Sequence, residues 1–149
     1  MSRSERSLVA LRTLAQFDLA SQGATVAECA AQRERARRDR DQCARQCEAS
    51  AESLRDIASR ASLNPILLAA ARDVFRSDRR QLEHAQQVLA EAEQREVAAR
   101  EELADIRNRE RSLDKVLGSE RRRTQLALTV KEMSLIDDLW LQQTGSTRA

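Results

Sequence analysis

The sequence is poor in the residues from which most globular cores and turns are built. Its 149 residues include only three aromatic side chains, Phe17, Phe75 and Trp140, together with three glycines and one proline. Sheet proteins need bulky or β-branched residues for their cores, and glycine or proline turns between their strands. The composition therefore argues against a β-sandwich, a barrel or a doubly wound sheet.

The sequence also lacks a strong excess of charge of one sign. It carries 26 basic and 24 acidic side chains, and a net charge of +2 gives little long-range field for nucleic acid or an anionic lipid surface. Three cysteines are an odd number and too few for a disulfide framework, so we expect a reducing cytoplasm. No apolar run approaches the roughly 18 residues of a membrane span, and Arg12 interrupts the run from Leu8 to Leu14. We therefore expect neither direct membrane insertion nor a cleavable secretory signal.

Helix-forming residues are abundant. Ala, Glu, Lys, Leu and Arg supply 82 of the 149 residues, a usage typical of long helices and coiled coils. The one strong break lies at Ser62–Pro65, where Asn64 can cap a helix and Pro65 fits the first turn of the next one. A connection this short between long helices favours an antiparallel pair. We therefore predict an all-α fold: a long antiparallel two-helix coiled-coil hairpin with a C-terminal helical extension.

The predicted hairpin is a single coiled-coil domain over residues 1–149. Its expected parts are a helical arm at about 5–61, a turn at 62–65, a helical arm at about 65–117, a C-terminal helix at about 120–143 and a frayed tail at 144–149. Two weaker signals leave the continuity of the helices open. Gly23 precedes a capping-box pattern at Thr25–Glu28, and Gly118 is followed by Ser119.

Apolar and small residues recur at steps of three and four along both arms, as in the seam of a coiled coil. In the second arm the two seam positions hold Phe75, Leu82, Leu89, Glu96, Leu103, Glu110 and Leu117, and Ala71, Asp78, Ala85, Ala92, Ala99, Ile106 and Leu113. In the first arm they hold Val26, Arg33, Arg40, Cys47 and Leu54, and Cys29, Ala36, Cys43, Ser50 and Ile57. Many of these side chains are small and bury less apolar area than leucine, so the predicted hairpin is only marginally stable.

Folding the chain at residue 64 predicts a register in which paired residue numbers sum to 128 or 129. In this register Arg33 falls opposite Glu96, Ser50 opposite Asp78 and Cys47 opposite Leu82. A buried Arg–Glu layer adds little net stability but fixes register, so we interpret Arg33 and Glu96 as register-setting residues.

The sequence contains no recognisable catalytic or metal-binding constellation. Cys29, Cys43 and Cys47 lie on the seam, where packing is favoured over a metal or redox site because no Cys-x-x-Cys and no clear fourth ligand are present. His84, the single histidine, has no placed nucleophile or carboxylate partner. The basic triplet Arg121–Arg123 lacks the aromatic residues that stack on nucleic-acid bases, so ion-paired helix faces are favoured over nucleic-acid binding. We expect no enzymatic activity, no cofactor and no bound metal.

The C-terminal helix is the most hydrophobic part of the sequence and lies beyond the paired arms. Its expected partner-binding residues recur at helical spacing: Leu126, Val130, Met133, Ile136, Leu139 and Trp140. An equally favoured alternative is that this face folds back on the first arm, against Leu8, Leu11, Leu14 and Phe17. The two interpretations are compatible, since paired terminal helices could enter a partner together.

The stretch Glu132–Trp140 contains the acidic pair Asp137 and Asp138, followed by Leu139 and Trp140. With a Gln- and Arg-rich helical hairpin before it, this layout resembles the FliJ/YscO-type proteins, the central stalk of bacterial flagellar and type III secretion export machinery. The resemblance implies a shaft similar to the γ subunit of rotary ATPases. It also implies a cytoplasmic location, held peripheral to the inner membrane by partners. Those partners would be a hexameric secretion ATPase, an export-gate membrane protein and, in some members, secretion chaperones.

Two other interpretations stay open at this point. One is a structural or adaptor coiled coil that dimerises and acts through helix–helix contacts. The other, less favoured, is a helical protein associated with nucleic acid, which would bind through Arg121–Arg123.

Overall fold

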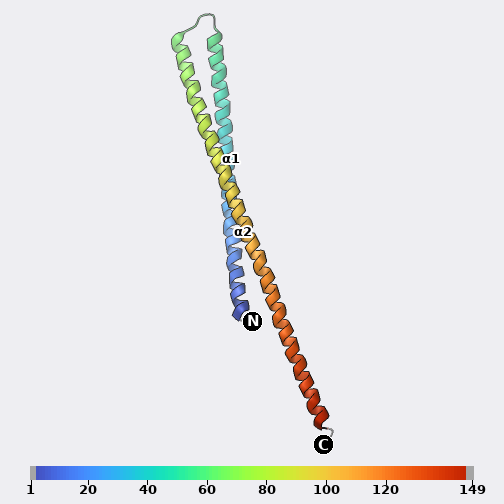
Figure 1. Cartoon of the computed structure of the whole chain (residues 1–149). Coiled ribbons are helices and arrows are strands. Elements are labelled where there is room, and N and C mark those ends of the chain that lie inside the picture. The colour runs from blue at the N-terminus through green and yellow to red at the C-terminus, as the bar shows by residue number, and fades with distance from the viewer. Residues whose placement is uncertain (1–2, 147–149) are drawn as a thin grey trace. The chain divides into compact units, whose positions relative to one another are not determined.

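The computed structural model describes residues 3–146, with two long helices that pack against each other in opposite directions (Figure 1). Helix α1 spans Arg3–Ser59 and helix α2 spans Pro65–Ser146. No strand occurs among residues 3–146. The predicted all-α helical hairpin is therefore confirmed.

The loop forms as the sequence predicts. The side chain of Asn64 accepts hydrogen bonds from the backbone N–H groups of Ile66 (3.1 Å) and Leu67 (3.4 Å), and its carbonyl accepts one from Leu68 (3.0 Å). Asn64 is thus the N-cap of α2, and Pro65 occupies the first helical position, where its missing N–H costs nothing. Helix α1 ends at Ser59, two residues before the expected end of the first arm.

Neither glycine interrupts its helix. Within α1, the hydroxyl of Thr25 donates to the carbonyl of Ser21 (3.3 Å) instead of capping a new helix. Helix α2 passes through Gly118 without a break, so residues 120–143 are the C-terminal part of α2 and not a separate helix. The reason is energetic: both glycines keep a negative φ, and a lone glycine inside a helix costs only about 1 kcal/mol. Of the tail expected to fray, residues 144–146 belong to α2, and residues 147–149 lie outside the described residues.

Contacts divide the chain into two compact units. Unit 2 is Ser21–Ala104 and contains the loop, whereas unit 1 combines Met1–Ala20 with Asp105–Ala149. Each unit contains a part of α1 and a part of α2.

The seam of unit 2 lies where the sequence predicts it. The least exposed residues on each helix recur at steps of three and four, from Gln22 to Ile57 on α1 and from Leu68 to Leu103 on α2. Every seam position predicted between these limits is buried or half-buried. The buried members are small or acidic: Ala36, Ala92, Ala99, Asp78 and Glu96.

The seam of unit 1 departs from the sequence expectation on α1. Its α1 residues are Glu5, Leu8, Arg12, Ala15 and Leu19, and its α2 residues are Ile106, Glu110, Leu113, Leu117, Glu120 and Thr124. The sequence predicts an apolar N-terminal face that includes Leu11, Leu14 and Phe17. In the structure these side chains are 50%, 58% and 71% exposed. Steps of three drift around a helix, whereas the alternation of three and four keeps Arg12 and Ala15 on the seam.

Candidate functional site

The expected register pair is present in unit 2. Arg33 Nε lies 3.0 Å from Glu96 Oε2, and Arg100 Nη2 lies 2.5 Å from Glu96 Oε1. The Glu96 side chain is only 5% exposed, so two guanidinium groups compensate the burial of one carboxylate. Arg33 is 39% exposed and keeps part of its hydration.

The other contacts between the helices are offset from the predicted register. In unit 2, Gln22 Nε2 donates to the carbonyl of Ala99 (3.0 Å) and to Glu102 Oε2 (3.2 Å). In unit 1, Ser4 Oγ donates to Glu120 Oε1 (2.7 Å) and Arg121 Nε donates to Glu5 Oε1 (3.2 Å). Arg12 Nε forms an ion pair with Asp114 Oδ1 (2.7 Å).

Residue numbers in these pairs sum to between 121 and 126, and only Arg33–Glu96 reaches the predicted 129. The predicted register is therefore wrong by about one helical turn. Its physical cause is the position of the loop, which is centred on Ser62, two residues before the assumed fold point. Arg33 still reaches Glu96 because an arginine side chain can span a turn of helix.

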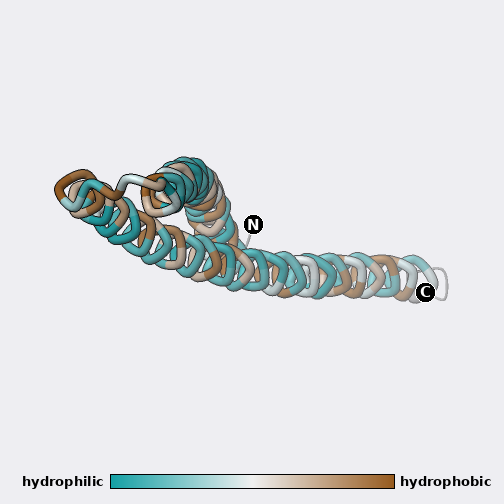
Figure 2. The backbone as a smooth tube through the Cα atoms, turned by 90° about the horizontal axis from the view of Figure 1, so that it is seen from above, coloured by the Kyte–Doolittle hydropathy of each residue, from teal (hydrophilic) through white to brown (hydrophobic). Residues whose placement is uncertain are grey.

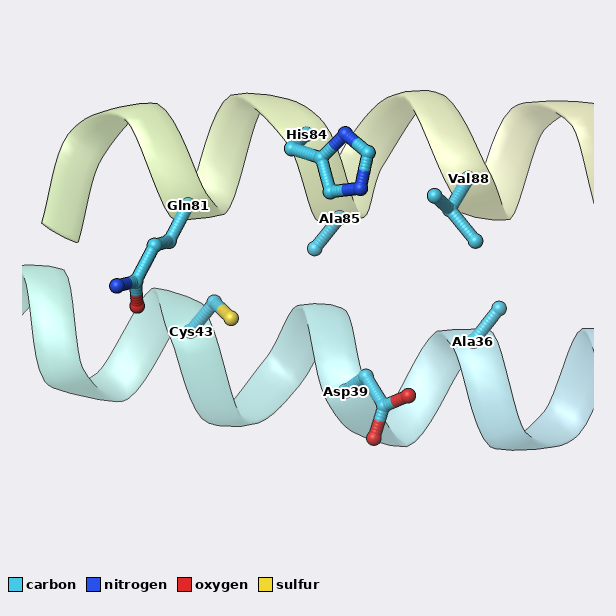
Figure 3. Close-up of a pocket in the computed structure, with 7 residues that line it drawn as sticks. All are labelled: Ala36, Asp39, Cys43, Gln81, His84, Ala85 and Val88. Carbon is cyan, nitrogen blue, oxygen red and sulfur yellow. The ribbon is translucent and has the colours of Figure 1, made fainter. Parts of the chain in front are cut away.

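A cavity of about 420 Å³ opens beside the seam of unit 2 (Figure 3). Residues of both helices line it: Ala36, Asp39, Cys43, Gln81, His84, Ala85 and Val88. Cys43 and His84 thus share one cavity, but within residues 3–146 no three His, Cys, Asp or Glu side chains are arranged to hold a metal ion. All three cysteines are half-buried free thiols on the seam, as expected for packing residues.

The six predicted partner-binding residues all lie on the surface of α2. Their exposed fractions run from 59% to 67%, for Leu126, Val130, Met133, Ile136, Leu139 and Trp140. Thr124 is the last half-buried residue of α2 whose side chain the structure describes. The fold-back alternative is therefore not found in unit 1. Figure 2 shows hydrophobic residues recurring along this part of α2.

The apolar face does not continue the hairpin seam. Beyond Thr124 the seam spacing falls on Ala127, Lys131, Ser134 and Asp138, which are mostly polar. Leu126, Val130 and Met133 each precede one of these positions by one residue, about 100° around the helix, and Trp140 likewise precedes Leu141, the next position at this spacing. The C-terminal face is consequently suited to a contact other than a longer hairpin, a distinction that hydrophobicity alone did not reveal.

The same offset extends back into the hairpin part of unit 1. Together, Arg109, Ser112, Val116, Ser119, Arg123, Leu126, Val130, Met133, Asp137 and Trp140 form an exposed line, which we call the flanking stripe. A cavity of about 490 Å³ lies on it, lined by Asn108, Arg109, Ser112, Leu113 and Val116. Hydrophobic spacing does not reveal this cavity, because three of the five residues that line it are polar.

Comparison with protein-family models, curated proteins and solved structures finds no match to this chain. Within residues 3–146, neither helix combines the length and the apolarity that crossing a membrane would take.

Proposed function

We propose that this protein is a non-enzymatic structural component that acts through helix–helix contacts, with the C-terminal part of α2 as its main binding element. The observation that carries this proposal is the exposure of six large apolar side chains on one continuous helix. An apolar face of this extent is uncommon on a protein without a partner.

The resemblance to FliJ/YscO-type proteins supports a more specific role. In that role the hairpin is a stalk of a bacterial type III secretion or flagellar export apparatus. The C-terminal part of α2 inserts in the hexameric secretion ATPase, and the loop end contacts the export gate, with chaperones as further partners. Both the hairpin and the position of the exposed face favour this assignment over nucleic-acid binding.

Mechanical coupling by such a stalk needs contact energies that differ between the states of the hexamer. A continuous helix supplies a suitable element, because α2 carries both the hairpin seam and the exposed face without a break at Gly118. Arg121 connects the two regions, since its guanidinium bonds Glu5 of α1 immediately before the exposed face begins.

The test is binding of the purified chain to a secretion ATPase hexamer from the same genome. Trp140→Ala combined with Ile136→Ala should abolish binding and leave the far-ultraviolet circular dichroism unchanged, because both side chains are exposed. A matched control is Val74→Ala with Val97→Ala, which removes exposed apolar side chains of unit 2 and should leave binding intact. Equal binding by both variants would contradict the proposal, and so would a hexamer that does not bind the wild-type chain.

A further inference from the structure

The part of α2 that carries the flanking stripe has opposite net charges on the two sides of the Leu126 and Val130 pair. Residues 119–125 contain one glutamate and three arginines, a net charge of +2, and of these arginines Arg121 is bonded to Glu5 of α1. Residues 131–141 contain one lysine, one glutamate and two aspartates, a net charge of −2. Between the two ends lie Leu126 and Val130, which are 67% and 65% exposed.

This pattern is complementary to itself when reversed. Two copies of the stripe placed antiparallel put each basic end against an acidic end, whereas a parallel arrangement puts like charges together. Apolar residues at the centre meet in either case, so charge selects the orientation.

We propose that two copies of this chain associate through an antiparallel contact between their flanking stripes, with a two-fold axis midway between Leu126 and Val130 of α2. In the register that keeps the spacing of three and four, Leu126 of each copy faces Val130 of the other. Asp137 then faces Ser119, within one turn of Arg122 and Arg123. Trp140 faces Val116, over the cavity of about 490 Å³.

Neighbouring registers fit less well. A shift of one heptad in one direction places Trp140 opposite Arg123 and Asp137 opposite Leu126, which buries a carboxylate against an apolar side chain. The opposite shift places Trp140 opposite Arg109. The register in which Leu126 faces Val130 also joins Trp140 to Val116 and buries no carboxylate against an apolar side chain, although it places Met133 opposite Arg123.

Helix α1 adds apolar surface beside the same contact. The cavity in Figure 3 is lined on both helices by residues that come one position before a seam residue, such as Asp39 on α1 and His84 and Val88 on α2. In an antiparallel helix pair, the positions that come one residue before the seam therefore lie on the same side of the pair in both helices.

The corresponding residues of unit 1 are Leu11 and Leu14 on α1 and Ser112 and Val116 on α2. Leu11, Leu14 and Val116 are 50%, 58% and 51% exposed. Trp140 of a second copy would cover these side chains. The contact thus explains exposed leucines on α1 that the hairpin seam leaves in solvent.

Sedimentation velocity of the full chain over a wide concentration range tests the proposal. The wild-type chain should form a dimer. Leu126→Ala with Val130→Ala should weaken dimerisation by about 100-fold, since the dimer contact loses two apolar side chains from each copy. The control Leu128→Ala with Leu135→Ala removes exposed leucines from another side of the helix and should change the dissociation constant by less than about threefold.

Charge reversal tests the orientation. Arg122→Glu with Arg123→Glu should weaken the dimer by about tenfold or more, and Asp137→Arg with Asp138→Arg should do the same, because each places like charges together at both ends. A chain that carries all four changes restores opposite charges in an antiparallel dimer and should recover the wild-type dissociation constant. All four residues are exposed, so the helices should remain intact.

A wild-type chain that stays monomeric at every concentration would overturn the proposal. A dimer whose strength is unchanged by either reversal would overturn the antiparallel contact. This inference does not depend on a secretion ATPase, since dimerisation is measured on the isolated chain. Binding of the hexamer by a strictly monomeric chain would instead assign the stripe to that partner.

Discussion

At the scale of single residues, Glu96 is the least exposed of the charged seam residues that the structure describes. Its carboxylate forms ion pairs with Arg33 across the seam and with Arg100 along α2. Arg33→Ala should lower the free energy of unfolding by about 1–3 kcal/mol, because one partner of a buried carboxylate is lost. Chemical denaturation followed by circular dichroism measures this change.

The control for this substitution is Arg12→Ala in unit 1. Arg12 and Asp114 form a 2.7 Å ion pair, but their side chains are 40% and 45% exposed, and exposed pairs contribute at most about 1 kcal/mol. An equal loss of stability in the two variants would contradict the special role of Glu96. The sequence predicted this pair because Arg33 and Glu96 were the polar exceptions at matching heptad positions.

Gly23 is a position where a side chain can be added to α1 without cost. Its φ is negative, and a methyl group built on its Cα would meet no atom within 4 Å beyond its chain neighbours and the adjacent backbone of its own helix. Gly23→Ala should therefore raise the free energy of unfolding by about 0.5–1 kcal/mol, since alanine restricts the unfolded chain and favours helix. A decrease would mean that the helix is bent or broken at this residue in solution.

At the scale of helices, the sequence predicted the seam better than its register. Heptad spacing identifies which side of a helix is buried, and it did so for every seam position between Val26 and Leu117 that we named. Register depends on where the loop is centred, and the assumed centre at residue 64 was two residues too late. The polar seam residues Glu5, Arg12 and Gln22 were missed because hydrophobicity does not mark side chains that are held at the seam by hydrogen bonds and ion pairs across it.

Leu117 is the least exposed apolar residue of unit 1, at 3%. Leu117→Ala should cost about 2–4 kcal/mol, because it removes buried apolar area and leaves a cavity in a seam with few large side chains. Leu128→Ala on the same helix should cost less than about 0.5 kcal/mol in a monomeric background, since Leu128 is 56% exposed. Thermal unfolding of both variants in the Leu126→Ala, Val130→Ala background measures their effect on folding separately from any effect on dimerisation.

For the molecule as a whole, the proposed contacts predict where stability depends on association. Long helices in water are held mainly by packing of one face, and within one copy the α2 residues after Thr124 have no such packing. At concentrations where the variant Arg122→Glu with Arg123→Glu is monomeric, its backbone amides of residues 126–141 should exchange with solvent at least about 100-fold faster than those of residues 92–117. At concentrations where the wild type is dimeric, this difference should shrink, and the slowing should be greatest around Val130.

Hydrogen exchange measured by mass spectrometry resolves these segments. Slow exchange along all of α2 in the monomeric variant would show that the exposed face is held by a contact within the chain, and neither the stalk nor the dimer could then use it as described.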